Sequence, residues 1–126
     1  MVVDCRDPRK QARWWDEALG WTLIHNSETE CIIIPSWVNE AVVRETPWDR
    51  SGPGMVFVSV PEGKSVKNRL HIDLAPHTSQ DRETEIERLE RLGAKRVDVG
   101  QPGDVSWTVL IDPEGNEFCV LSPRDI

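Results

Sequence analysis

The order of apolar and polar positions predicts that strands and helices alternate in the first half of the chain. Residues 2–5 predict a short strand, and one helical face follows at Ala12, Trp15 and Leu19. Asp7 as N-cap and Pro8 at the first helical position predict where this helix begins, and Gly20 predicts where it ends. Three further strands are predicted at 21–25, 31–34 and 55–60.

The second half has the same order of elements. A helical face is predicted at Ile86, Leu89 and Leu92, and Gly93 follows it as a stop. Thr78 and Asp81 have the spacing of a capping box and predict the start of this helix. Strands are predicted at 70–74, 95–99, 106–111 and 116–121.

This repetition predicts an α+β fold made of two βαβββ modules in a pseudo-two-fold arrangement. We expect one domain over residues 1–126, with the first module at about 1–62, a linker at 63–67 and the second module at about 68–126. A chance resemblance between two common α+β units is the alternative. Residues 35–54 contain several Pro and Gly and predict a long loop.

Period-two alternation assigns the strand side chains to faces. The set expected to pack on the helices comprises Val56, Val58, Val60, Leu70, Ile72, Leu74, Phe118 and Val120. The opposite set, expected to line a trough, comprises Asp4, Phe57, Ser59, His71, Asp73, Glu117 and Cys119. If Ile111 pairs with Asn116 across the turn at 112–115, Trp107 lies on the helix-facing side, whereas a bulge would shift this register by one residue.

Composition narrows the class of protein. A net charge of −7 argues against nucleic-acid binding and against an anionic membrane surface as partners. No apolar run approaches the roughly 20 residues that span a bilayer, and no secretory signal is visible at the N-terminus. The three cysteines include no C-x-x-C pair and are typical of reduced thiols, so we expect a cytoplasmic protein.

Three segments carry a family resemblance: VVDCRDPRKQARWWDEALGW, KNRLHIDL and LIDPEGNEFCVL. Together they resemble the glyoxalase/bleomycin-resistance/dioxygenase superfamily, also called vicinal oxygen chelate proteins, and within it the small glyoxalase-like domains common in actinobacteria. The resemblance implies a curved mixed sheet around a trough that holds a small molecule. It also implies a homodimer. It does not fix the reaction, since the superfamily includes isomerases, dioxygenases, thiol transferases and drug-sequestering proteins.

Metal-dependent members of this superfamily carry ligands at four trough positions. The resemblance places these positions at Val2 or just before the chain starts, at Phe57, at His71 and at Cys119, with Glu117 two residues before the last. Only His71 is a usual ligand at its position, so we expect either no cofactor or a weakly bound divalent metal. The metal candidates are His71, Glu117 and Cys119.

Candidate site residues follow from the polar strand face and from the loop. His71 and Glu117 are the candidate catalytic residues. The candidate ligand-binding residues are Asp4, Phe57, Asp73, Cys119 and Trp48. For each, a structural role is the alternative: a hydrogen-bonded histidine, a small buried cysteine, or a carboxylate in solvent. Trp48 belongs to the 35–54 loop, which we expect to cover a bound ligand.

Three functions remain open at this level. The chain binds a small molecule of unassigned identity in the trough. Alternatively, it is a metal-dependent lyase, isomerase or dioxygenase with a remodelled site, or it is a non-enzymatic interaction or drug-sequestering module.

Overall fold

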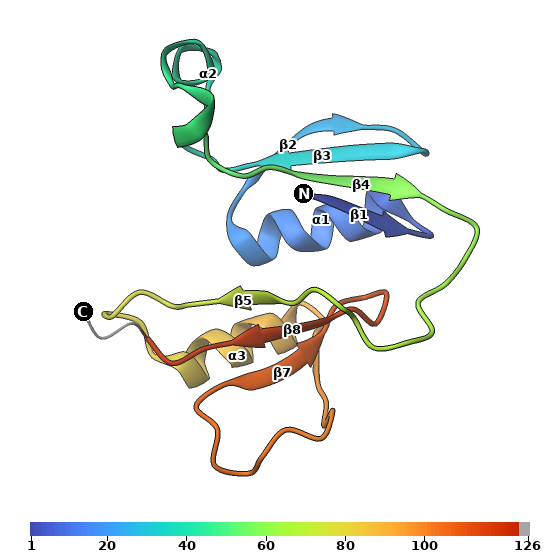
Figure 1. Cartoon of the computed structure of the whole chain (residues 1–126), viewed down its shortest axis with the longest axis vertical. Coiled ribbons are helices and arrows are strands. Elements are labelled where there is room, and N and C mark those ends of the chain that lie inside the picture. The colour runs from blue at the N-terminus through green and yellow to red at the C-terminus, as the bar shows by residue number, and fades with distance from the viewer. Residues whose placement is uncertain (124–126) are drawn as a thin grey trace. The chain divides into compact units, whose positions relative to one another are not determined.

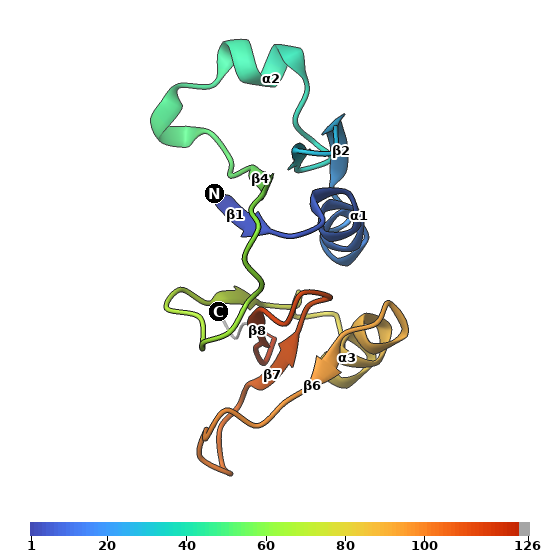
Figure 2. The same cartoon turned by 90° about the vertical axis from the view of Figure 1, so that its right-hand side faces the viewer.

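The computed structural model describes residues 1–123, which form two compact units that meet between Gly63 and Lys64. Each unit contains one four-stranded sheet and a helix of ten residues or more (Figure 1). In Figure 2 the helix of each unit is seen along its axis beside the sheet of the same unit. No helix in residues 1–123 has both the length and the apolar character that a membrane span requires.

The first unit has a mixed sheet. Its elements in chain order are β1 (Val2–Cys5), α1 (Pro8–Leu19), β2 (Thr22–Asn26), β3 (Glu30–Ile34), α2 (Glu40–Glu45), the 3₁₀ helix η1 (Trp48–Arg50) and β4 (Met55–Ser59). The strands lie in the order β1-β4-β3-β2, with β1 and β4 parallel and the other pairs antiparallel. The first strand and the last strand of the unit are therefore neighbours, as a βαβββ module requires.

Helix α1 begins and ends where the sequence predicts. The Asp7 carboxylate accepts a hydrogen bond of 3.1 Å from the Lys10 backbone N–H, and Pro8 follows it as the first helical residue. Gly20 has φ +64°, a left-handed conformation that costs little only without a side chain. These local signals are confirmed because they depend on neighbours in the sequence alone.

The face assignment of β4 was wrong. Phe57 and Met55 are buried on the α1 side with their cross-strand partners Cys31 and Ile33, whereas Val56 lies on the opposite face and is only half-buried. Strand β4 is apolar on both faces, so alternation shows which residues share a face but not which face the helix covers. The bulkier pair fills the space against α1.

The segment at 35–54 is not a simple loop. It contains α2 and η1, and the Asn39 side chain caps α2 by accepting a 2.9 Å hydrogen bond from the Val42 N–H. The Trp37 ring lies over Gly52, where an added Cβ would be 2.8 Å from it. The prolines and glycines that flank α2 mark its ends, which is why the segment as a whole predicted irregular structure.

The second unit repeats the topology of the first. Its elements are β5 (Ile72–Leu74), α3 (Arg82–Arg91), β6 (Lys95–Arg96), β7 (Thr108–Ile111) and β8 (Glu117–Val120). The strand order is β5-β8-β7-β6, with β5 parallel to β8. The strand predicted at 95–99 has only two residues in the structure, and a long loop from Val97 to Trp107 follows it.

Helix α3 starts three residues later than a capping box at Thr78 predicts. Asp81 is itself the N-cap: its carboxylate accepts hydrogen bonds from the Thr84 N–H at 2.8 Å and from the Thr84 hydroxyl at 2.9 Å. A carboxylate followed three residues later by a threonine satisfies the first-turn donors without any upstream partner.

The register between β7 and β8 differs by one residue from the simplest hairpin. Ile111 pairs with Glu117, and Val109 pairs with Cys119. The Asp112 carboxylate holds the turn, accepting 3.0 Å hydrogen bonds from the N–H groups of Glu114 and Asn116. This shift reverses the faces of β7, because a one-residue slip moves every side chain to the other side of the sheet.

Candidate functional site

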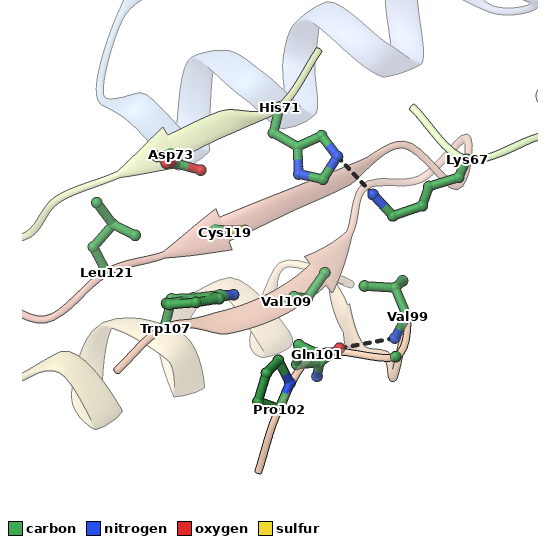
Figure 3. A pocket seen from close by; sticks show the side chains of 11 residues that line it. Lys67, His71, Asp73, Val99, Gln101, Pro102, Trp107, Val109, Cys119 and Leu121 are labelled. Carbon is green, nitrogen blue, oxygen red and sulfur yellow. Dashed lines mark hydrogen bonds between the residues drawn. The ribbon is translucent and has the colours of Figure 1, made fainter. Parts of the chain in front are cut away.

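The second unit has a pocket of about 450 Å³ on the face of its sheet that is turned away from α3 (Figure 3). Its apolar lining consists of Val99, Pro102, Trp107, Val109 and Leu121. Its polar lining consists of Lys67, His71, Asp73, Gln101 and Cys119. The pocket is therefore formed by three strands of one sheet together with the segment before β5 and the loop after β6.

Strand register explains why these side chains meet. Cys119 pairs with Asp73 on one side and with Val109 on the other, so the three side chains stand in a row on one face. His71 precedes Asp73 by two residues and shares its face, as alternation predicts. Trp107 precedes Val109 by two residues and also lines the pocket. Its predicted helix-facing position was wrong because of the register shift.

His71 is exposed and lies beside a cation. Its Nε2 is 3.0 Å from Lys67 Nζ and 3.3 Å from the carbonyl oxygen of Asn68. An ammonium only donates, so the tautomer with its hydrogen on Nδ1 accepts from Lys67, whereas the other tautomer donates to Asn68. The ring can therefore present either a donor or an acceptor to the pocket.

Cys119 is buried, with 6% of its surface exposed. Burial raises the pKa of its thiol, and the neighbouring Asp73 carboxylate raises it further by its charge and by a hydrogen bond from the thiol. The group therefore remains a neutral thiol at neutral pH, and a neutral thiol is a weak metal ligand and a weak nucleophile.

Glu117 does not line the pocket. It is 9% exposed, and its carboxylate accepts 2.9 Å hydrogen bonds from Lys64 Nζ and from the Asn68 N–H. Burial acts to raise the pKa of this carboxyl, but the Asn68 and Lys64 hydrogen bonds outweigh it, so the pKa lies below its ordinary value. Glu117 is thus an ionised anchor for residues 64–68, the segment that carries Lys67 into the pocket.

The remaining predicted site residues lie in the first unit. Phe57 is fully buried against α1, so it cannot line a trough on the opposite face, and that prediction was wrong. Asp4 is exposed on the face of β1 turned away from α1. Trp48 is 90% exposed in η1. Whether the 35–54 segment covers a bound ligand stays a prediction.

Sequence reasoning named His71, Asp73 and Cys119 among the residues that line the pocket and missed the others, of which Lys67, Gln101 and Trp107 matter most. Lys67 and Gln101 were absent from the candidates, and Trp107 was assigned to the wrong face. The glycines and the proline at 100–103 are a turn signal that marks the loop carrying Gln101. No local signal marks Lys67, because its role depends on how Glu117 holds the backbone of the next residue, Asn68.

A family model described as a glyoxalase-like domain matches residues 1–121. The chain belongs to this family. The resemblance read from the sequence is therefore confirmed at the level of the glyoxalase-like domain. No curated protein that was compared matches this glyoxalase-like domain in sequence.

Solved structures share the fold. A glyoxalase/bleomycin resistance protein/dioxygenase family enzyme from Burkholderia phytofirmans superposes with a TM-score of 0.68 at 14% identity, over 98% of this chain and 96% of that one. A glyoxalase-related enzyme from Fulvimarina pelagi gives 0.66 at 13% identity, over 97% and 84%. A mutant of the fosfomycin resistance protein FosX from Listeria monocytogenes, solved with Mn(II) and a dihydroxypropylphosphonic acid, gives 0.67 at 11% identity, over 98% and 86%. The predicted fold class is confirmed.

The residues of this glyoxalase-like domain do not fit the divalent metal that FosX holds. Within residues 1–123, no three His, Cys, Asp or Glu side chains are grouped closely enough to hold an ion. Glu117 is occupied by Lys64 and Asn68, the Cys119 thiol is protonated, and His71 lies beside the Lys67 ammonium. A cation in the pocket would gain at most His71 and the Asp73 carboxylate as ligands, fewer than the three of a catalytic metal site, and would lie beside the Lys67 ammonium.

Proposed function

We propose that this glyoxalase-like domain binds a small organic molecule non-covalently in the pocket of its second unit. The observation that carries the proposal is the composition of that pocket. Apolar side chains line most of its wall, and a few polar groups, among them Lys67, His71 and Asp73, converge at one part of it. Small-molecule sites in proteins have this character, and their volumes start at about 300 Å³.

Trp107 supports a ligand with a planar or extended apolar part. Its ring lines the pocket and is 37% exposed, whereas Trp15 of the first unit is 2% exposed. An indole that keeps an accessible face on a pocket wall provides a stacking surface. This supports a polar aromatic compound as the class of ligand.

The metal-dependent lyase, isomerase or dioxygenase remains the second candidate. The family favours it in general, but among the proposed metal residues the pocket contains only His71 and Cys119. Glu117 serves the backbone of Asn68 instead. We therefore infer binding as the primary function, with His71 and Asp73 as ligand-contacting groups.

We also propose that the protein acts in the cytoplasm as a homodimer, with neither nucleic acid nor membrane as a partner. Strands β1 and β2 are the edges of the first sheet, and β5 and β6 are the edges of the second. Exposed sheet edges favour association between chains. Light scattering at micromolar concentration tests this, and a monomer mass would contradict it.

The binding proposal is tested by screening small aromatic compounds against the full chain by ligand-observed NMR. Each hit is then titrated against Trp107→Ala and against Ile24→Ala, a control at an exposed apolar side chain of the first unit. We expect Trp107→Ala to weaken binding at least tenfold and Ile24→Ala to leave it unchanged. A screen without hits, or hits indifferent to Trp107→Ala, would contradict the proposal.

A further inference from the structure

The polar part of the pocket carries charges of opposite sign. Lys67 lies next to His71, and Asp73 lies two residues further along β5. Figure 3 shows Lys67 on the far side of His71 from Asp73. Since a strand rises about 3.3 Å per residue, the Cα atoms of His71 and Asp73 are about 6.6 Å apart. The Lys67 ammonium and the Asp73 carboxylate thus face one pocket from the two sides of His71.

Neither charge is neutralised by the protein. Among the ion pairs of residues 1–123, none involves Lys67 or Asp73, although Lys64, three residues before Lys67, is paired with Glu117. Both side chains are exposed. Both charges also act on the Cys119 thiol. Burial is the main cause of the raised pKa of this thiol, Asp73 raises the pKa further, and Lys67 lowers it. The electrostatic fields of Lys67 and Asp73 therefore overlap at Cys119, on the floor of the pocket.

The indole of the pocket lies beyond Asp73. Val109 is level with Cys119, and β7 runs back through Thr108, paired with Val120, to Trp107. Trp107 and Leu121 therefore lie about two residues beyond the level of Asp73, on the side away from His71. Figure 3 shows both on the side opposite Lys67. A ligand that lies along this face passes Lys67 and His71 first, then Asp73, and reaches the indole at its other end.

We propose that the ligand is a zwitterion of the amino-acid class with an apolar side chain. Its carboxylate lies beside Lys67 and His71, its ammonium lies beside Asp73, and its side chain lies against Trp107 and Leu121. An α-amino acid carries the two charges on groups bonded to one carbon, which suits a Lys67 ammonium held beside His71 and an Asp73 carboxylate two residues further along the chain. This inference rests on the proposed function and adds the chemical class of the ligand.

Three probes with the same phenyl group test the charges. L-phenylalanine carries both charges, 3-phenylpropanoate carries only the negative one, and 2-phenylethylamine carries only the positive one. We expect phenylalanine to bind about tenfold more tightly than either single-charge probe, since each charge-assisted hydrogen bond contributes about that factor. Glycine, which has both charges and no side chain, is expected to bind at least tenfold more weakly than phenylalanine.

Two charge-removing variants assign each charge to its residue. Lys67→Gln should weaken phenylalanine and 3-phenylpropanoate about tenfold and leave 2-phenylethylamine unchanged. Asp73→Asn should weaken phenylalanine and 2-phenylethylamine and leave 3-phenylpropanoate unchanged. Lys10→Gln and Asp49→Asn remove the same charges from exposed positions of the first unit and serve as controls.

The outcomes separate the two proposals. If phenylalanine binds no more tightly than 3-phenylpropanoate, or if Asp73→Asn leaves its dissociation constant unchanged, the zwitterion inference is wrong. The proposal that the pocket binds a small molecule would still be supported by any screening hit whose affinity falls in Trp107→Ala. If no compound of the probe set or of the screen binds in a Trp107-dependent way, the proposed function fails as well.

Discussion

Glu117 and Lys64 lie 53 residues apart in the sequence and form an ion pair of 2.9 Å between Oε1 and Nζ. Their side chains are only 9% and 19% exposed, so the pair is largely removed from water. The second carboxylate oxygen holds the Asn68 N–H. One acidic residue of β8 thereby fixes the backbone next to Lys67, and the geometry of the pocket depends on a group that does not line it.

Removing this anchor should destabilise the second unit. Glu117→Ala leaves the Lys64 ammonium and the Asn68 N–H without their acceptor, so we expect a loss of about 1–3 kcal/mol in the free energy of unfolding. Urea titration followed by circular dichroism measures it. Glu28→Ala, at a side chain that is 86% exposed, is the matched control and should change stability by less than about 0.5 kcal/mol. Equal effects of the two substitutions would contradict the anchoring role.

The same carboxyl should contribute to acid sensitivity. Its pKa in the folded chain lies below the ordinary value of 4.5, so its stabilising contribution is present above pH 4.5 and is lost as the pH falls through the folded pKa. We expect Glu117→Gln to reduce the steepness with which stability declines below pH 4.5. Unfolding curves measured between pH 3 and 6 on both proteins test this, and parallel profiles would speak against it.

Cys119 should react slowly with alkylating reagents. Burial and the Asp73 carboxylate raise its pKa above the ordinary 9.0, so the thiolate is a minor species at neutral pH. We expect iodoacetamide to modify Cys119 at least tenfold more slowly than free cysteine at pH 7.5. Peptide mapping by mass spectrometry resolves this site from the other two buried cysteines, Cys5 and Cys31. Asp73→Asn should accelerate the reaction, whereas unchanged kinetics would contradict the electrostatic part of the argument.

Substitutions in β4 should distinguish its two faces. Phe57 is fully buried against α1, and we expect Phe57→Ala to cost about 3–5 kcal/mol of stability. Val56→Ala, on the half-buried opposite face, should cost about 1 kcal/mol, as smaller side chains lose less buried area. Thermal unfolding by calorimetry compares the two, and a larger effect at Val56 would reverse the face assignment.

Metal should bind weakly to the resting protein. In the pocket only His71 and Asp73 offer ordinary metal ligands, fewer than the three protein ligands of a catalytic metal site, and the Lys67 ammonium 3.0 Å from His71 Nε2 opposes a second cation. We expect less than stoichiometric zinc, iron, nickel or manganese after dialysis, measured by inductively coupled plasma mass spectrometry, and no change in melting temperature with EDTA. If a stoichiometric metal survives dialysis and is absent from His71→Ala, the metal-dependent enzyme would replace small-molecule binding as the favoured function.

The sequence alone determined the features that depend on neighbours along the chain. Asp7, Pro8 and Gly20 bound α1 as predicted, because caps and left-handed stops are local. The repeated order of strand, helix and three strands predicted the glyoxalase-like fold. Alternation along the strand predicted at 70–74 placed His71 and Asp73 together, and both line the pocket, although β5 itself begins at Ile72.

Only the tertiary structure decided the contacts that depend on register and on packing. Strand β4 is apolar on both faces, so the packing of α1 decided that Phe57 is buried and Val56 is not. The turn at Asp112 shifted the register of β7 by one residue and moved Trp107 to the pocket. Glu117 shares a face with Cys119, but the backbone at 64–68 covers it. The identity of a residue decides which groups it can bind. The fold decides which group from a distant part of the chain lies beside it.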